Sequence, residues 1–275
     1  MHGDTKKIRV DFTGAPETML ATLYGRALDA DADRPILGDT YAKELVQRLD
    51  YDWSKTAITA KNAPSVTIRS AHFDGWARQF LAVHEEATVL HLGCGLDSRF
   101  LRLRPGPGVD WYDVDYPNVI ALREQFYPPG ASYRLMSASV TELDWLSAVP
   151  ADRPVLVLGE GLTMYLTKES GLALLRRVVE RFPSGELQFD VFNRLGIRTQ
   201  ILNTPVRRAG ARMHWGVDGP DEILRAVPGL RLLVAMSVFD AEGFRDVPRR
   251  YRVMARVMSL VPALKNMAQF HRYAF

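Results

Sequence analysis

Cysteine, excess charge of one sign and long apolar runs are all scarce in this chain of 275 residues. The single cysteine, Cys94, excludes an internal disulfide and any metal site built on several cysteines. The 35 basic and 32 acidic residues leave a net charge of +3 without a long run of like charge, so we expect no nucleic-acid partner. No apolar run reaches membrane-spanning length, and we expect no membrane partner.

The N-terminus and the composition narrow the class of protein further. The stretch from Met1 to Asp11 is polar and charged, unlike a secretory signal peptide, so we expect a cytoplasmic protein. Hydrophobic residues make up 47% of the chain, which is enough for one large domain or for a domain with a cap. The sequence shows neither internal repeats nor low-complexity segments.

The spacing of apolar residues divides the chain into two parts. Residues 1–85 lack strand runs, and helices are expected over 17–28, 39–49 and 64–83. Strands and helices alternate in residues 86–275. The alternation predicts an α/β fold with a doubly wound, mostly parallel Rossmann-like sheet behind a helical N-terminal cap, and an antiparallel pairing stays open for the last two strands. Strands are expected over 88–92, 109–114, 133–135, 154–159, 186–192, 230–238 and 269–275, and helices over 98–102, 117–125, 169–181 and 220–226.

A glycine-rich turn follows the first of these strands. The apolar run that ends at Leu92 leads into Gly93-Cys94-Gly95, and a helix is expected directly after it. The two glycines permit backbone angles and close approaches that a side chain would block, and the next helix directs its free N–H groups at the turn. Such a turn holds a nucleotide-like cofactor in an open α/β sheet, although two glycines alone also occur in many surface turns.

Acidic residues end the second strand about twenty residues after the turn. Asp113 and Asp115 are two residues apart, so they share one face of the strand, and Pro117 ends it. A carboxylate at this position accepts hydrogen bonds from ribose hydroxyls. The order of glycine turn and acid favours a cofactor site over two ordinary acids at a strand end.

Several motifs occur in a fixed order along nearly the whole chain. They are Thr22-Leu-Tyr-Gly-Arg26, Asp39-Thr-Tyr-Ala42, the segment from His91 to Arg99, Asp113-Val-Asp-Tyr-Pro117 and Glu160-Gly-Leu-Thr-Met-Tyr-Leu166. Together with Arg69 in the helix before the first strand, they resemble the leucine carboxyl methyltransferase family. More narrowly, they resemble its bacterial branch of polyketide O-methyltransferases of the tetracenomycin type. The resemblance implies a class I methyltransferase fold with S-adenosylmethionine as cofactor, S-adenosylhomocysteine as product and no metal.

The resemblance also implies roles for individual residues. Gly93 and Gly95 would flank the methionine part of the cofactor, and Asp115 would bind the ribose hydroxyls. Arg69 and Arg26 would pair with the methionine carboxylate, because a guanidinium fork matches a carboxylate.

Two further positions complete the cofactor site that the resemblance implies. Glu160 would face the amino-acid or sulfonium region. Ser139-Val140 stands where family members commonly have Asp-Leu against the adenine, and Glu142 is a possible substitute.

An acceptor pocket is expected after the fourth and fifth strands. Its apolar and aromatic residues suit a flat apolar molecule, although the same residues also fit ordinary core packing. Tyr165 and His214 are the candidate catalytic residues. His214 would serve as a base for a phenol, whereas a carboxylate acceptor needs none. The expected lining residues are Met164, Tyr165, Phe192, Asn193, Met213, His214 and Trp215.

These observations predict methyl transfer to a phenolic hydroxyl or a carboxylate of a small, largely apolar, polyketide-like metabolite. An NAD(P)-dependent reductase is an alternative, but Ser98 replaces the third glycine of GxGxxG, and Tyr165 and Lys168 are three rather than four residues apart. A non-catalytic protein that binds S-adenosylmethionine stays open because of Ser139-Val140. Within the family, methylation of a protein's C-terminal carboxylate is the remaining alternative.

Overall fold

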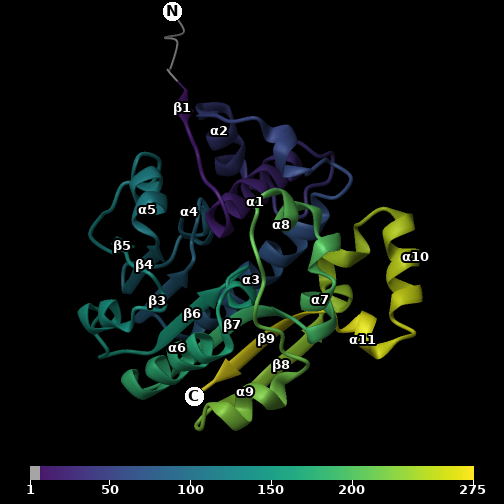
Figure 1. Ribbon diagram of the computed structural model, residues 1–275. Helices are drawn as coiled ribbons and strands as arrows, with labels where there is room; N and C mark the ends of the chain where they lie inside the picture. The colour runs from purple at the N-terminus through teal and green to yellow at the C-terminus, as the bar shows by residue number, and fades with distance from the viewer. Residues whose placement is uncertain (1–6) are drawn as a thin grey trace, which may run out of the picture.

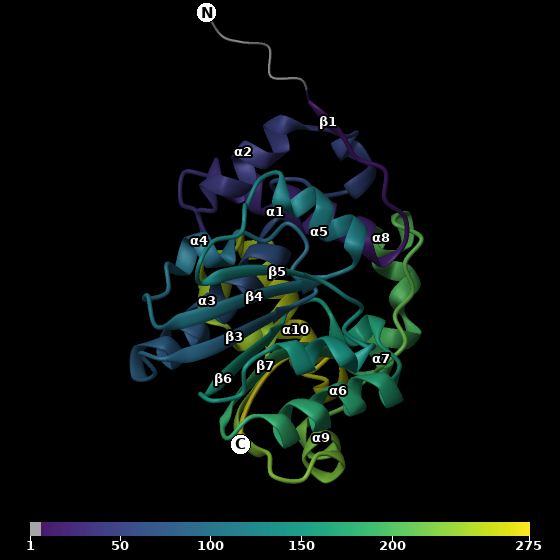
Figure 2. The ribbon, with the colours of Figure 1, turned by 90° about the vertical axis from the view of Figure 1, so that its left-hand side faces the viewer.

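The computed structural model describes residues 7–275, apart from the side chain of Leu143. The first six residues, which belong to the stretch where no signal peptide is expected, lie outside the described part. Seven strands form one sheet in the order β5-β4-β3-β6-β7-β9-β8 (Figures 1 and 2). They are β3 (Ala87–Leu92), β4 (Val109–Asp115), β5 (Tyr133–Ser137), β6 (Val155–Gly159), β7 (Gly185–Phe192), β8 (Arg231–Ser237) and β9 (Ala268–Ala274).

The sheet is mostly parallel, as the alternating pattern predicts. β3 pairs in parallel with both β4 and β6, and all six of its residues are buried, as expected for an apolar strand covered on both faces. β9 runs antiparallel to both β7 and β8, so the antiparallel pairing left open for the last two strands is present. The expected α/β fold class is therefore confirmed.

Two large hydrophobic clusters lie on the two faces of the sheet, and alternate residues of the central strands β3, β4 and β6 point to opposite clusters. Leu90 and Val157 join the cluster beneath α6 (Lys168–Arg181) and α9 (Pro220–Ala226). Val89 and Leu156 join the cluster beneath α1 (Ala15–Ala30), α3 (Pro64–Val83) and α5 (Pro117–Glu124). This period of two fixes the register, because a slip by one residue would exchange the faces of each strand. The short helix α4 (Arg99–Leu103) follows the turn after β3.

The N-terminal part contains the three expected helices, α1 (Ala15–Ala30), α2 (Thr40–Arg48) and α3 (Pro64–Val83). Asp39 begins α2 by accepting a hydrogen bond from the Ala42 N–H, and Pro64 occupies the first turn of α3. The expectation of no strands in this part was wrong. β1 (Ile8–Arg9) and β2 (Leu49–Asp50) form a two-stranded parallel sheet, and two residues are too few to show a period of two.

Several helices after β7 were not predicted. α7 (Arg194–Arg198) and α8 (Thr204–Arg208) begin at Asn193 and Asn203, whose side chains accept backbone N–H hydrogen bonds. α10 (Arg249–Met258) and α11 (Pro262–Lys265) lie between β8 and β9. No helix within residues 7–275 is both long and apolar enough to cross a bilayer. Short 3₁₀ turns are η1 (Trp53–Thr56), η2 (Leu143–Ala148), η3 (Thr163–Tyr165), η4 (Gln200–Leu202), η5 (Val238–Asp240) and η6 (Glu242–Arg245).

The strand order places a crevice at one edge of the sheet. From β3 the chain proceeds to β4 and β5 on one side, and from β6 it proceeds to β7 on the other. Ligands of open α/β sheets bind beyond the carboxyl ends of the strands where this order reverses. The topology therefore predicts a ligand site next to the residues that follow β3 and β6.

Candidate active site

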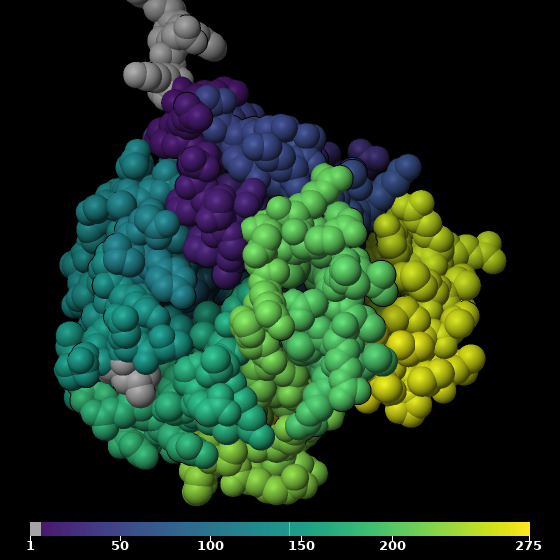
Figure 3. Space-filling model, viewed as in Figure 1, coloured from purple at the N-terminus to yellow at the C-terminus, as the bar shows by residue number. Residues whose placement is uncertain are grey.

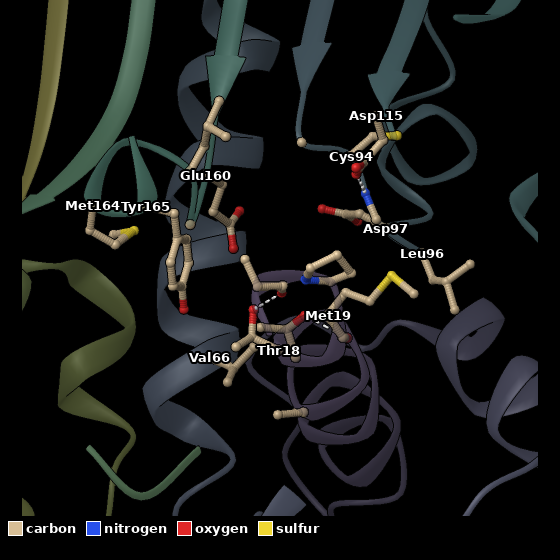
Figure 4. Close-up of a pocket in the computed structure, with 18 of the residues that line it drawn as sticks. Thr18, Met19, Val66, Cys94, Leu96, Asp97, Asp115, Glu160, Met164 and Tyr165 are labelled. Atoms are coloured by element: carbon tan, nitrogen blue, oxygen red, sulfur yellow. Dashed lines mark hydrogen bonds between the residues drawn. The ribbon is translucent and has the colours of Figure 1, made fainter. Parts of the chain in front are cut away.

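A cavity of about 360 Å³ lies at this edge, between the strand ends and α1 (Figure 4). The space-filling view shows the surface hollowed where the N-terminal segment meets the sheet domain and the segment near residue 200 (Figure 3). Its cofactor-side lining comes from the turn after β3, the ends of β4 and β6, and the loop after β5. These lining residues include Gly93, Cys94, Gly95, Leu96, Asp97, Asp115, Tyr116, Val119, Ala138, Val140, Glu160, Gly161 and Leu162.

The glycine turn forms one wall of the cavity and requires its glycines. Gly93 and Gly95 have φ values of 63° and 50°, a region that side-chain-bearing residues rarely adopt. A Cβ on Gly95 would lie 3.1 Å from the Met19 Cβ, so α1 packs directly on the turn. A Cβ on Gly93 would lie 3.2 Å from the Leu162 Cδ1. The backbone is therefore kept bare where a ligand would approach.

Asp113 and Asp115 have different environments although they share one strand face. The Asp115 carboxylate lines the cavity and accepts hydrogen bonds from the Gly95 and Tyr116 N–H groups, each at 2.8 Å. Burial raises the pKa of Asp115, and the two N–H donors oppose that rise. Its position beside the glycine turn suits a contact to ribose hydroxyls.

Asp113 is fully buried behind the cavity and is bonded on all sides. It accepts hydrogen bonds from Trp111 Nε1 at 2.9 Å and the Tyr133 hydroxyl at 2.6 Å, and it pairs with Arg123. Burial alone would raise the pKa of Asp113, but Arg123 and a contact with His91 lower it to about 2. No capacity is left for a ligand, so Asp113 supports the strand rather than the cofactor.

Arg69 and Glu160 meet on the opposite wall of the cavity. Arg69 Nε donates to Glu160 Oε1 at 3.0 Å, and its Nη1 donates to Asp190 Oδ2 at 2.9 Å. Ser70 Oγ also donates to Glu160 Oε1, and Arg99 pairs with Oε2. Burial opposes ionisation of Glu160, yet Arg99 and Arg69 lower its pKa to about 2. Arg69 Nη2 donates to no group in the described part of the chain, which leaves it available to a ligand carboxylate.

Arg26 also lines the cavity and is only 3% exposed. Its contacts are long: Nε lies 3.4 Å from Asp39 Oδ2, and Nη2 lies 3.4 Å from the Leu96 carbonyl oxygen. A buried guanidinium with such weak partners retains donors for an incoming anion. Both arginines that the resemblance assigns to the methionine carboxylate thus lie on the cavity wall.

Sequence reasoning missed the ion-pair network behind these residues. Arg99 is fully buried and pairs with Asp74, Asp97 and Glu160, while Asp190 holds both Arg69 and the Gly161 N–H. Burial raises the pKa of Asp190, and Arg69 opposes that rise. A signal was present in the sequence, since Asp190 interrupts the apolar end of β7 as Glu160 follows that of β6.

Of the two residues expected to contact the adenine, only Val140 lines the cavity. Val140 and its neighbour Ala138 line it, whereas Ser139 does not. The Ser139 hydroxyl instead pairs with the Thr141 hydroxyl at 2.8 Å, and Glu142 is exposed. The structure therefore offers the apolar contact of Val140 and places the two polar candidates away from the wall.

The acceptor side of the cavity contains four of the seven expected residues. Met164, Tyr165, Phe192 and Met213 line it, and burial raises the pKa of Tyr165. The remaining lining residues on this side were not predicted, because they come from α1, the segment before α3, the first turn of α3, and α8 with the residue that caps it. They include Thr18, Met19, Ile58, Ser65, Val66, Asn203, Pro205 and Val206.

The other three expected residues lie outside the cavity lining. Asn193 begins α7, where its side-chain oxygen accepts from the Gly196 N–H at 2.8 Å. Trp215 packs against α6, so that a Cβ on Gly171 would lie 2.1 Å from its ring. His214 is exposed. The structure therefore does not support His214 as the base: its side chain faces solvent, while its neighbours Met213 and Trp215 are buried.

The cavity suits the cofactor expected from the resemblance. The site offers a glycine turn without side chains, the Asp115 carboxylate as a hydrogen-bond acceptor, and the buried guanidiniums of Arg69 and Arg26. These groups match the chemistry of a nucleoside linked to an amino acid. Ionised Glu160 adds negative charge to a site that would receive a sulfonium and an ammonium group. The apolar wall at Val140 and Val119 suits a base ring.

Comparisons with known proteins identify the family. The sequence model of the leucine carboxyl methyltransferase family matches residues 19–179. The chain is 42% identical over 266 residues to the tetracenomycin polyketide synthesis O-methyltransferase TcmP of Streptomyces glaucescens, covering 97% of this chain and 98% of that protein. It is 38% identical to the S-adenosyl-L-methionine-dependent methyltransferase dpfgK of Gibberella zeae, covering 86% and 87% of the two chains.

Solved structures agree in fold at low sequence identity. A protein of Thermobifida fusca superposes with a TM-score of 0.59 and 14% identity, covering 90% of this chain and 93% of that one. A DUF574-family protein of Streptomyces avermitilis superposes with a TM-score of 0.56 and 13% identity, covering 91% of this chain and 96% of that one. The family match, the near full-length relatives and the cavity at the glycine turn lead to one conclusion. The chain belongs to the leucine carboxyl methyltransferase family and is an S-adenosylmethionine-dependent O-methyltransferase.

Proposed function

We propose that this enzyme methylates a phenolic or carboxylic oxygen of a small, largely apolar, polyketide-like metabolite. The observation that carries the proposal is the near full-length similarity to TcmP, whose name assigns it to polyketide synthesis. The acceptor side of the cavity supports it, because that wall is built mainly from apolar side chains. These are Met19, Ile58, Val66, Met164, Phe192, Val206 and Met213. A cytoplasmic location stays a prediction from the sequence.

When bound, S-adenosylmethionine supplies an electrophilic methyl group on a positively charged sulfur. The chain's own residues position the reactants and exclude water. Positioning supplies much of the rate acceleration when two molecules must meet in line. On the cofactor side we assign Gly93, Gly95 and Asp115 to the nucleoside and Arg69 to the carboxylate. Val140 would contact the adenine, and Arg26 and Glu160 would complete the methionine site.

Tyr165 is the residue that we assign to the acceptor oxygen. Its raised pKa keeps the hydroxyl protonated near neutral pH, so it donates a hydrogen bond and does not remove a proton. Glu160 is a poor base because a carboxylate with a pKa of about 2 has little affinity for a proton and its oxygens are already paired. The site therefore favours an acceptor that arrives ionised, such as a carboxylate or an acidic phenol.

The test is a methyl-transfer assay with labelled S-adenosylmethionine and a panel of acceptors. The panel contains aromatic polyketide carboxylic acids, the matching phenols and a peptide that ends in leucine. We expect label in the aromatic compounds, and Tyr165→Phe should lower the rate about tenfold, the effect of one lost hydrogen bond. His214→Ala should keep the wild-type rate.

Two results would overturn this assignment. Label only in the peptide would make the enzyme a protein carboxyl methyltransferase. A steep fall in phenol methylation with His214→Ala would restore that histidine as the base.

A further inference from the structure

An unusual concentration of exposed apolar side chains lies on α10 and the turn after it. Val253, Met254, Val257, Leu260 and Val261 are between 47% and 80% exposed. They make up five of the nine large hydrophobic residues found exposed in the described part of the chain. α10 lies on the outer flank of the molecule, drawn in yellow (Figures 1 and 3). We name these five residues the α10 apolar row.

The row faces solvent because the opposite side of α10 faces the protein. Ala255 is buried, and Tyr251 packs on the cluster formed by α3 and β9. At 100° per residue, Val253 and Val257 lie roughly opposite these two positions, and half-exposed Met254 lies at the border between the two sides. A helix that already has a packed side does not need this second apolar side for folding. The row is therefore available to something outside the chain.

Arginines accompany the row. Arg249, Arg250, Arg252 and Arg256 are all exposed, and none forms an ion pair with another residue of the described chain. No aspartate or glutamate occurs between Val247 and Phe275. On a helical wheel Arg249, Arg252 and Arg256 lie along one edge of the row, whereas Arg250 lies between Val257 and Met254. This is the pattern of a basic amphipathic helix, whose arginines border an apolar strip.

We propose that α10 docks the enzyme on an anionic lipid surface. Its apolar row would enter the boundary between headgroups and acyl chains, while the arginines extend to the lipid phosphates. A second copy of the chain fits less well, since a symmetric contact through α10 would bring arginines against arginines. A nucleic acid would use the arginines but would leave the apolar row in water. A projecting helix suits a flat surface, whereas a peptide partner would need a groove.

The docking surface lies close to the acceptor side of the cavity. Arg250, Tyr251 and Met254 share a shallow hollow with the segment Thr59 to Asn62. The neighbouring residues Ile58, Ser65 and Val66 line the cavity. Docking through α10 would thus bring the acceptor side near a lipid phase in which an apolar acceptor collects. This consequence for substrate supply rests on the proposed function, whereas the docking itself does not.

The proposal revises the expectation of no membrane partner. That expectation rested on the lack of a membrane-spanning run, which bears only on insertion across a bilayer. Peripheral docking needs only one short amphipathic face and nearby positive charge.

The test is co-sedimentation of the full chain with lipid vesicles. One set contains phosphatidylcholine alone, and the other contains equal parts of phosphatidylcholine and phosphatidylglycerol. We expect binding to the anionic vesicles only, and binding should weaken as salt is added, because salt screens the arginines. Val257→Glu and Arg252→Glu should each lower the partition coefficient about tenfold.

Matched controls use residues outside the docking surface. Val83→Glu changes a valine that is 74% exposed, and Arg177→Glu changes an exposed arginine of α6. Both should bind vesicles like the wild type. All four variants should keep the wild-type melting temperature and methyl-transfer rate in lipid-free solution, so a failure of docking is distinguishable from a failure of the proposed function.

Three results would overturn the proposal. The first is no sedimentation with anionic vesicles at low salt, and the second is an equal loss in the control variants. The third is a dimer in analytical ultracentrifugation that Val257→Glu dissociates, which would assign the α10 apolar row to a second copy of the chain.

Discussion

Asp113 and Asp115 show how two identical side chains on one strand face acquire different roles. Asp115 keeps its carboxylate on the cavity wall, held by two backbone N–H groups. Asp113 is enclosed by Arg123, Trp111 and Tyr133. The difference comes from depth below the strand end, since Asp115 is the last residue of β4.

Substituting the two aspartates separately should separate cofactor binding from stability. Asp115→Ala should weaken cofactor binding by roughly 1.5–3 kcal/mol, the range for losing a hydrogen bond to a charged group. Asp113→Ala should instead lower the free energy of unfolding by about 3–5 kcal/mol, because it leaves Arg123 buried and unpaired. Calorimetry with S-adenosylhomocysteine and urea denaturation measure the two quantities. Equal losses of affinity at both positions would show that the ribose contact is misassigned.

The local chemistry of the cofactor side was predictable from the sequence, whereas its support was not. Asp115 ends β4, and Gly93, Gly95 and Glu160 come just after β3 and β6, so their place at the sheet edge follows from topology. Asp190 contacts Arg69 from 121 positions away in the sequence, and Arg99 contacts Glu160 from 61 positions away. No spacing rule reveals such contacts. His214 is the converse case, because proximity in sequence to Met213 did not place its side chain at the cavity.

At the scale of single elements, α1 is the part that closes the cavity. Met19 packs on Gly95, and the Gly14 N–H donates to the Ala209 carbonyl oxygen after α8. The N-terminal end of α1 is weakly secured, because Gly14 precedes it with φ of 72° and supplies no side-chain cap. We infer that α1 opens and closes over the site more readily than the sheet helices. We therefore propose that residues 1–85, which contain α1, form a cap on the domain of residues 86–275.

Hydrogen exchange tests this inference about α1. Adding S-adenosylhomocysteine should slow amide exchange in Ala15–Ala30, because a ligand beneath the helix opposes its opening. Lys168–Arg181 serves as the internal control, since α6 packs on the far face of the sheet. Exchange in α1 that does not respond to the ligand, or that slows no more than in α6, would show that α1 is a fixed wall.

Element prediction succeeded where apolar residues face the core and failed where they do not. The strands of the sheet and the helices α5, α6 and α9 bury one side, so their periodicity marks them clearly. α10 carries its apolar residues on both sides, and α7 and α8 are five residues long. A helix that is very short, or that carries apolar residues on two sides, lacks the single apolar stripe by which an amphipathic helix is recognised in a sequence.

For the whole molecule, buried charge makes stability depend on acid pH. The pKa of Glu160 falls from an ordinary 4.5 to about 2 in the folded protein, and that of Asp113 falls from 3.8 to about 2. A lowered pKa means that the stabilisation is complete above about pH 4.5 and is lost as pH falls toward 2. Asp115 and Asp190, whose pKa values are raised, act in the opposite sense.

A pH series of urea unfolding checks this prediction. The wild-type free energy of unfolding should fall between about pH 4.5 and pH 2, the interval between the two pKa values of Glu160. Glu160→Gln should be less stable than the wild type at pH 7, because Arg99 and Arg69 lose a buried partner. It should also lose less stability on acidification. An unchanged acid dependence in Glu160→Gln would mean that this carboxylate is not held ionised by its arginines.

The most direct test of the central claim is calorimetric titration of the purified chain with S-adenosylmethionine, S-adenosylhomocysteine and NADPH. The cavity at the turn after β3 predicts heat of binding for the first two ligands without added metal, and none for NADPH. It also predicts that Asp115→Ala and Arg69→Ala each reduce that affinity, with Arg69→Lys restoring it only in part, since an ammonium cannot reproduce the planar fork that holds Glu160 and Asp190 while a third nitrogen faces the ligand. No heat with either sulfur compound, together with clear binding of NADPH, would contradict the account.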